Sequence, residues 1–231
     1  MLFTFDHVSV TGAGGPRLTD VTGSIQETGI TAVVGPSGSG KSTLLRLGNR
    51  LELPDSGTVS FRGTNISDLD PRKLRRRVAM VFQRPTPFVG SVLENLWVAA
   101  PELTETAAAD LLTRVGLDEQ FLNRDAILLS AGEAQRVCLA RALATQPEVV
   151  LMDEPTSALD PPARADLELW ARALADSGVP LVWVTHDLAQ MERMADQVLV
   201  MINGTIVHSA SVATRLADAP PAAHKFLSRS N

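Results

Sequence analysis

One glycine-rich segment constrains the fold of this chain more than any other feature. Residues 35–42 read GPSGSGKS, which fits the pattern G-x-x-x-x-G-K-[ST]. The segment follows an apolar run, Ile30–Val34, that is typical of a buried strand, and it opens a segment of helical character over residues 41–50. The strand–loop–helix context gives the pattern its meaning, because elsewhere the same residues would be an ordinary glycine- and serine-rich turn.

The chemistry expected of this loop is phosphate binding. Glycines let the backbone wrap closely around an anion, and the N–H groups of the loop and of the following helix then point at it. Lys41 would supply charge to the β- and γ-phosphates of a nucleotide, Ser42 a hydroxyl ligand for Mg²⁺, and Thr43 a contact to the α-phosphate. The residues expected to form the cradle are Gly35, Pro36, Ser37, Gly38, Ser39, Gly40, Lys41, Ser42 and Thr43.

A pair of acids, Asp153 and Glu154, directly follows the apolar run at residues 149–152. Ligands of open α/β sheets bind at the carboxyl ends of the strands, where this pair would lie. We therefore predict that Asp153 holds Mg²⁺, directly or through water, and that Glu154 is the general base that polarises the attacking water. Taken alone, the pair could instead be two acids favoured by the dipole at a helix N-terminus.

Strand and helix patterns alternate along much of the chain. Strands are expected at residues 1–10, 18–25, 30–34, 58–61, 78–82, 149–152, 181–185, 198–202 and 205–208, and helices at 41–50, 104–115, 130–143, 161–175 and 188–195. Residues 12–16 are expected to form a turn, and Asn203-Gly204 a tight hairpin. The alternation predicts a mostly parallel sheet covered by helices, with residues 84–146 as an inserted helical lobe.

Composition excludes several classes of protein. With 231 residues, 45% of them hydrophobic and 20% charged, the chain is expected to fold around its own core. No apolar run approaches the roughly 18–20 residues of a membrane span, and no secretory signal pattern is expected at the N-terminus. The net charge of −5 argues against nucleic acid as a partner. The single cysteine, Cys138, is expected to be a small core residue in a reducing compartment.

One basic cluster breaks the acidic balance of the chain. It consists of Arg72, Lys73, Arg75, Arg76 and Arg77. We expect a solvated face at this position, with contact to a partner or to lipid headgroups as the alternative.

Six motifs in order relate the chain to a known family. Besides the glycine-rich loop and the acid pair they are Gln83, the run LSAGEAQR at 129–136, the run SALD at 157–160 and the run THD at 185–187. With these motifs the chain resembles the nucleotide-binding subunit of an ABC transporter over residues 2–210. The resemblance implies an α/β fold in one ABC ATPase domain over residues 1–231. Its P-loop NTPase core (RecA-like, mostly parallel sheet) would take residues 1–83 and 147–231, with an N-terminal antiparallel β subdomain, and the helical lobe residues 84–146.

The resemblance also implies roles for residues outside the loop. Gln83 would sense Mg²⁺ and the attacking water, and His186 would contact the γ-phosphate and position that water with Glu154. Ser130 and Gly132 would bind the γ-phosphate of an ATP held by the opposite subunit, and Asp160 would communicate across the dimer. Two copies, or this chain and a related one, would thus enclose two ATP molecules with Mg²⁺, and hydrolysis would let them part.

The resemblance extends to a membrane partner. The segment between Arg84 and Asn95 would dock an integral-membrane permease, with Phe88 at a groove edge, which places the subunit peripherally on the cytoplasmic side of the membrane. Alternatively, Phe88 is buried and packs only against its own lobe. The segment is similar both to phosphate-import ATPases and to exporter-type ATPases, and the chain also looks like the small ATPases of metal or iron exporters.

Two departures from the family pattern matter. The signature motif usually reads LSGGQ, whereas Ala131 stands here at the first glycine, so the approach to the γ-phosphate is expected to be looser. The aromatic residue on which adenine stacks would fall near Thr11 and Gly12, where no aromatic stands. The alternatives to a transport ATPase are a weakly hydrolysing ATP-dependent regulatory module and a soluble ABC-type ATPase acting on DNA or ribosomes.

Overall fold

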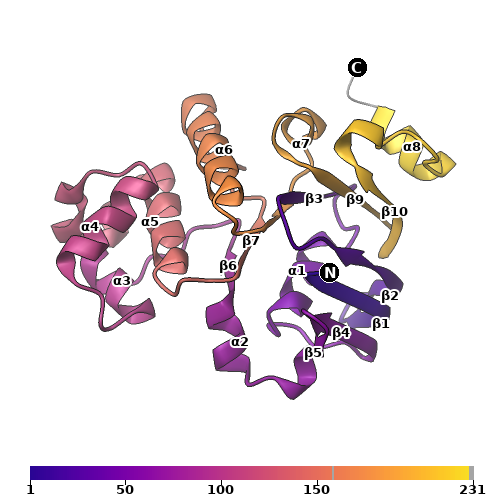
Figure 1. Ribbon diagram of the computed structural model, residues 1–231, viewed down its shortest axis with the longest axis horizontal. Coiled ribbons are helices and arrows are strands. Elements are labelled where there is room, and N and C mark those ends of the chain that lie inside the picture. The colour runs from indigo at the N-terminus through magenta and orange to yellow at the C-terminus, as the bar shows by residue number, and fades with distance from the viewer. Residues whose placement is uncertain (158, 229–231) are drawn as a thin grey trace.

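Two β-sheets form the framework of the computed structural model, which describes residues 1–157 and 159–228 (Figure 1). The smaller sheet is antiparallel and has the strand order β2-β1-β4-β5. Its strands are β1 (Phe3–Gly12), β2 (Gly15–Ile25), β4 (Ser56–Phe61) and β5 (Thr64–Asn65). Alternating burial along β1 shows that one face of this sheet packs against the core while the other faces solvent.

The larger sheet has six strands in the order β10-β9-β3-β8-β7-β6. They are β3 (Ile30–Val34), β6 (Val78–Val81), β7 (Val149–Asp153), β8 (Leu181–Val184), β9 (Gln197–Ile202) and β10 (Thr205–Ser211). All neighbours pair in parallel except β9 and β10, which form a hairpin. Every residue of β3, β7 and β8 is buried, as expected for parallel strands covered on both faces.

Helices cover the larger sheet and extend past its β6 edge. They are α1 (Lys41–Gly48), α2 (Pro71–Arg77), α3 (Val92–Ala99), α4 (Glu105–Arg114), α5 (Ala131–Leu143), α6 (Pro161–Asp176), α7 (Leu188–Met194) and α8 (Pro221–Leu227). Four short 3₁₀ helices are η1 (Ile66–Asp68), η2 (Glu119–Asn123), η3 (Ala126–Leu128) and η4 (Val212–Thr214). Helices α3, α4 and α5 gather at the left of Figure 1. None of the helices in the described ranges combines the length and the apolar character needed to cross a bilayer.

The predicted mixture of a mostly parallel sheet and covering helices is confirmed, and the neighbours reported below share it. The hairpin at Asn203 and Gly204 is also confirmed, with φ values of 50° and 78°. The turn expected at residues 12–16 is present but shorter, because Gly12 pairs with Gly15 and leaves a loop of only two residues. Pro16 is tolerated inside β2 because β2 is an edge strand of its sheet.

The helix α8 was not expected from the sequence. Its apolar residues Ala223 and Leu227 pack with the outer faces of β3 and β9, a tertiary contact that a seven-residue pattern does not reveal. Helix α3, which lies inside the stretch expected only as generally helical, begins at a capping box in which Ser91 and Glu94 satisfy each other's backbone N–H groups.

The basic cluster on α2 is only partly a solvated face. Arg75 donates to the carbonyl oxygen of Arg50 at 2.6 Å, and Arg77 donates to Glu148 at 2.5 Å while its guanidinium lies 5.0 Å from the Phe61 ring centroid. These two arginines therefore hold α2 against the rest of the fold. The remaining three basic residues of the cluster are exposed.

Candidate functional site

The glycine-rich loop connects the end of β3 to the start of α1, as the sequence predicts. A Cβ at Gly35 would collide with the carbonyl oxygen of Met201, and one at Gly40, whose φ is +95°, would lie 2.7 Å from the carbonyl oxygen of Arg17. Only glycine fits at these two positions. The backbone of β9 approaches Gly35 and that of β2 approaches Gly40, and the φ of Gly40 lies in the left-handed region. The loop is thus held tightly against β9 and β2 while its other side stays open.

Lys41 occupies the mouth of this loop. Its Nζ donates to the carbonyl oxygens of Gly35 and Pro36, both at 2.9 Å, although the residue is only 5% exposed. Burial lowers the pKa of the Lys41 ammonium, and the nearby carboxylates of Glu154 and Asp153 oppose that effect. The loop carbonyls therefore fix a partly desolvated positive charge at the position where an anion would enter.

Ser42 and Asp153 join α1 to the end of β7. The Ser42 hydroxyl donates to Asp153 Oδ1 at 2.8 Å. Burial raises the pKa of the Asp153 carboxyl, and the hydrogen bond from Ser42 partly offsets this effect. A hydroxyl and a carboxylate are hard oxygen ligands of the kind that Mg²⁺ takes beside substrate phosphates, so these two residues fit that ion. The described residues contain no cluster of three or more His, Cys, Asp or Glu side chains that would form an all-protein metal cage.

Glu154 stands at the meeting point of three segments. Its Oε2 lies 3.2 Å from His186 Nδ1, which follows β8, and 3.5 Å from Gln83 Nε2, which follows β6. Glu154 has a φ of +44°, an uncommon value for a residue with a side chain, and its N–H donates to the carbonyl oxygen of Val184 at 3.2 Å. The turn thus aims the carboxylate away from β7 and toward Gln83 and His186.

One pocket brings Lys41, Ser42, Gln83 and Glu154 together. Its lining residues are Arg17, Ser37, Gly38, Gly40, Lys41, Ser42, Thr43, Gln83 and Glu154. Among these residues, Arg17 alone was not expected from the sequence to belong to the site. It directly precedes Leu18, the first residue of the expected second strand. His186 lines a second pocket that shares Glu154 with the first. The predicted general base therefore lies on the wall between them.

The remaining predicted residues do not line this pocket. Ser130 is the exposed N-cap of α5, where its hydroxyl accepts from the N–H of Glu133 at 3.3 Å. A Cβ at Gly132 would find its nearest neighbour 3.7 Å away, at Leu159. Asp160 is exposed and caps α6 by accepting from the N–H of Ala163 at 2.9 Å. Within the run 157–160, Ala158 lies outside the described residues.

A phosphate loop between strand and helix, with a carboxylate pair at the end of a nearby parallel strand, defines a P-loop protein that binds a nucleoside triphosphate. Comparison with known proteins specifies the class. The family model described as "ABC transporter" matches residues 18–157. ABC transporter I family member 17 of Arabidopsis thaliana is 39% identical, over 98% of this chain and 88% of its own length.

Two further matches agree. The phosphate import ATP-binding protein PstB of Thermotoga maritima is 40% identical, with 81% of each chain covered. A dimeric ATP-binding cassette, solved in a post-hydrolysis state with ADP and Pi bound, superimposes with a TM-score of 0.81 at 28% identity, covering 91% of this chain and 98% of the other. The chain belongs to the ABC transporter family. It is an ATP-binding subunit of that family, and its activity is ATP hydrolysis.

Proposed function

We propose that this chain powers transport by closing in pairs around ATP and reopening after hydrolysis. The observation that carries the proposal is the division of the site. The pocket of one copy holds Lys41, Gln83 and Glu154, whereas Ser130 and Gly132 lie outside it. A complete site then requires a second copy, and that need is what would couple ATP to motion.

Lys41 and the loop N–H groups would bind the phosphates of ATP. On binding, the Lys41 ammonium would exchange its two carbonyl partners, Gly35 and Pro36, for phosphate oxygens. The loop from Gly35 to Gly40, with Ser42 and Thr43 at the helix N-terminus, would supply the dipoles that stabilise charge on the β- and γ-phosphates. Ser42 and Asp153, with Gln83 from the neighbouring strand end, would hold Mg²⁺, which neutralises phosphate charge when bound.

Glu154 would be the general base. Glu154 accepts a hydrogen bond from Gln83 Nε2, and its carboxylate lies within hydrogen-bond distance of His186 Nδ1, so the carboxylate is oriented before the nucleotide binds. A water placed between Glu154 and the γ-phosphate would give its proton to the carboxylate as it attacks. His186, with a side chain that is 69% exposed, is free to contact the γ-phosphate and to keep Glu154 aligned.

The exposed N-terminus of α5 would complete the site of the opposite copy. Ser130 already accepts one hydrogen bond as the helix cap, but its own O–H remains available to donate to a phosphate oxygen. The space beside Gly132 lets a phosphate approach the helix N-terminus closely, where the dipole favours negative charge. Asp160, exposed at the start of α6, would face the partner copy.

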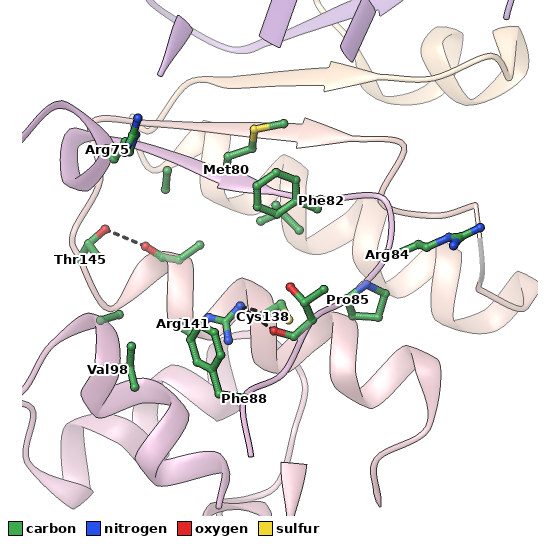
Figure 2. Close-up of a pocket in the computed structure, with 15 residues that line it drawn as sticks. Arg75, Met80, Phe82, Arg84, Pro85, Phe88, Val98, Cys138, Arg141 and Thr145 are labelled. Atoms are coloured by element: carbon green, nitrogen blue, oxygen red, sulfur yellow. Dashed lines mark hydrogen bonds between the residues drawn. The ribbon is translucent and has the colours of Figure 1, made fainter. Parts of the chain in front are cut away.

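A groove beside the helical lobe would receive the membrane partner. Figure 2 shows its wall, which includes Phe82, Pro85, Phe88, Val98, Cys138 and Arg141. The Phe88 side chain is 47% exposed and its ring centroid lies 4.3 Å from the Arg141 guanidinium, so it is a groove residue and is not buried within its lobe. An apolar surface that also carries Arg75, Arg84 and Arg141 suits a short amphipathic helix of a permease. Docking there would place the subunit on the cytoplasmic face of the membrane.

The groove and the ATP pocket are both lined by the segment that follows β6. Phe82 lines the groove, whereas Gln83, the next residue, lines the ATP pocket. A movement of the lobe during ATP binding would therefore be transmitted directly to a helix bound in the groove. This adjacency supports residues 84–146 as a lobe that moves relative to the core.

Replacement of Glu154 by Gln tests the proposal. Gln keeps the shape and most hydrogen bonds of the site but cannot accept the proton, so turnover should fall by roughly 10²–10⁴-fold. The variant should form a stable dimer with Mg-ATP, visible as a change in elution volume or in light scattering. Glu102→Gln, which changes an exposed acid outside the pocket, is the charge-matched control. A Glu154→Gln protein that stays monomeric with Mg-ATP would refute the closing step.

A further inference from the structure

Arg17 is the one residue in the wall of the ATP pocket that comes from the antiparallel sheet. In the hairpin of β1 and β2, Val10 pairs with Leu18 and Thr11 pairs with Pro16, so Arg17 has no partner across the strand. An unpaired extra residue is a β-bulge, and a bulge redirects a side chain out of the regular alternation. Leu18 enters the core while the Arg17 side chain turns to the pocket.

Glu52 fixes the guanidinium plane of Arg17. Nη1 and Nη2 of Arg17 donate to the two carboxylate oxygens of Glu52, both at 3.0 Å. Such a two-pronged pair holds the plane in one orientation and neutralises its charge. Because 37% of the side chain remains exposed, part of its surface is still available to a ligand.

Gly12 makes the room for this arrangement. A Cβ at Gly12 would lie 2.7 Å from Arg17 Nε and 3.1 Å from its Cδ, so any side chain at position 12 would displace the arginine. None of the described residues that line the pocket carries an aromatic ring. The wall that the antiparallel sheet contributes to the pocket therefore carries one flat group, the Arg17 guanidinium. A nucleobase can stack on such a group.

We propose that the Arg17 guanidinium, held flat by Glu52, is the platform on which the base of the nucleotide stacks. If the phosphates lie in the loop near Lys41 and Glu154, the base would extend toward the side where α1 meets β2, and that side carries Arg17. Stacking on a guanidinium uses the π-face that every base has, and it does not read a donor and acceptor pattern. Stacking on Arg17 alone therefore does not discriminate between bases, and the site should accept GTP as well as ATP.

A phosphate contact is the competing role for Arg17. Nη1 and Nη2 of Arg17 both donate to Glu52, so the charge of the guanidinium is paired, whereas the buried Nε has no hydrogen-bond partner among the described residues. Stacking requires no change in this ion pair. A phosphate that accepts from the two N–H groups now directed at Glu52 would compete with that carboxylate.

The assignment of Arg17 rests on the proposed function. It is tested by enzyme kinetics together with binding of tripolyphosphate, a ligand that has phosphates but no base. The wild-type protein, Arg17→Ala, Arg17→Lys and Glu52→Gln are assayed for phosphate release from ATP and from GTP, and inorganic tripolyphosphate binding is measured by calorimetry. Arg62→Ala is the matched control, because Arg62 has a similar exposure of 39% and pairs with Glu148 at 3.1 Å outside the pocket.

Arg17→Ala should raise KM for both nucleotides about tenfold, with kcat within about twofold and tripolyphosphate affinity unchanged. Arg17→Lys should behave in the same way, since lysine has the charge but no plane. Glu52→Gln should also raise KM, while tripolyphosphate affinity holds or increases because a positive charge is released. Wild-type kcat/KM for ATP and GTP should agree within about fivefold.

Two results would overturn the assignment while leaving ATP hydrolysis intact. One is an equal loss of ATP and tripolyphosphate affinity in Arg17→Ala that lysine restores, which would mean a phosphate contact. The other is wild-type KM for ATP in both Arg17 variants. A preference for ATP over GTP above about 100-fold would refute the lack of base discrimination. A wild-type protein that releases no phosphate with either nucleotide would instead refute the proposed function.

Discussion

Gln190 on α7 offers the sharpest test of how the site is held together. Its side chain is 1% exposed and makes three hydrogen bonds. It accepts from Trp183 Nε1 at 3.2 Å, and it donates to Thr156 Oγ1 at 3.1 Å and to Glu168 Oε1 at 2.8 Å. These contacts tie α7 to β8, to the turn after Glu154 and to α6, so they brace the segment that carries His186.

Gln190→Leu keeps the volume of the side chain and removes all three bonds. The Trp183 N–H, on a residue that is 1% exposed, would be left without a partner at a cost of about 1–3 kcal/mol. Loss of the bond to the Glu168 carboxylate has a similar cost, which is reduced because Glu168 still accepts from Arg193 at 3.0 Å. The apolar surface that leucine adds to the core offsets part of the total loss. We therefore expect Gln190→Leu to lower the free energy of unfolding by about 3 kcal/mol and the Tm by about 6–12 °C for a domain of this size.

The assay is urea unfolding of the nucleotide-free protein, followed by tryptophan fluorescence and circular dichroism. Gln135→Leu is the matched control: Gln135 is 2% exposed, but within the part of the chain that the structure describes its amide makes one long side-chain bond, 3.4 Å to the carbonyl oxygen of Phe82. It should cost less than about 1.5 kcal/mol. In a Trp183→Phe background the cost of Gln190→Leu should fall by about 1–2 kcal/mol, because the N–H is gone. A Gln190→Leu protein no less stable than Gln135→Leu would refute the reasoning.

Three further outcomes are expected. Asp153→Asn should abolish Mg-dependent turnover yet stabilise the nucleotide-free protein at neutral pH. Burial raises the folded-state pKa of Asp153, so the wild-type loses stability as pH rises from about 4 through that raised pKa; Tm profiles of the two proteins that coincide from about pH 4 to 8 would contradict this. Ser130→Asp should leave Tm nearly unchanged, because Asp caps a helix as well as Ser, but it should prevent the ATP-dependent dimer by repelling phosphate; dimerisation equal to wild-type would exclude Ser130 from the interface. Phe88→Asp should fold normally and lose co-purification with a co-expressed permease, whereas Leu169→Asp, at an exposed α6 leucine, should retain it; equal retention by both would remove the groove as the docking site.

Local sequence pattern was enough to predict the phosphate loop and the order of strands and helices around it. The predicted strand at Ile30–Val34 and the helix start at Lys41 coincide with the structure, because local pattern and local backbone demand agree there. Ser130 and Thr104 cap their helices as polar residues ahead of helical runs do. The acid pair was likewise found from an apolar run followed by two charges.

Tertiary structure decided which of these residues meet. That Gln83 and His186 reach one carboxylate oxygen of Glu154 depends on the strand order, which places β8 next to β7 and β7 next to β6, and pattern reasoning does not fix strand order. Arg17 lies between the expected turn and the expected strand, and only a register shift in the hairpin turns its side chain toward the pocket. Helix α8 likewise depends on a packing surface made by β3 and β9. Local propensity acts over a few residues, whereas register and packing join residues that are far apart in the chain, and only the folded structure contains those contacts.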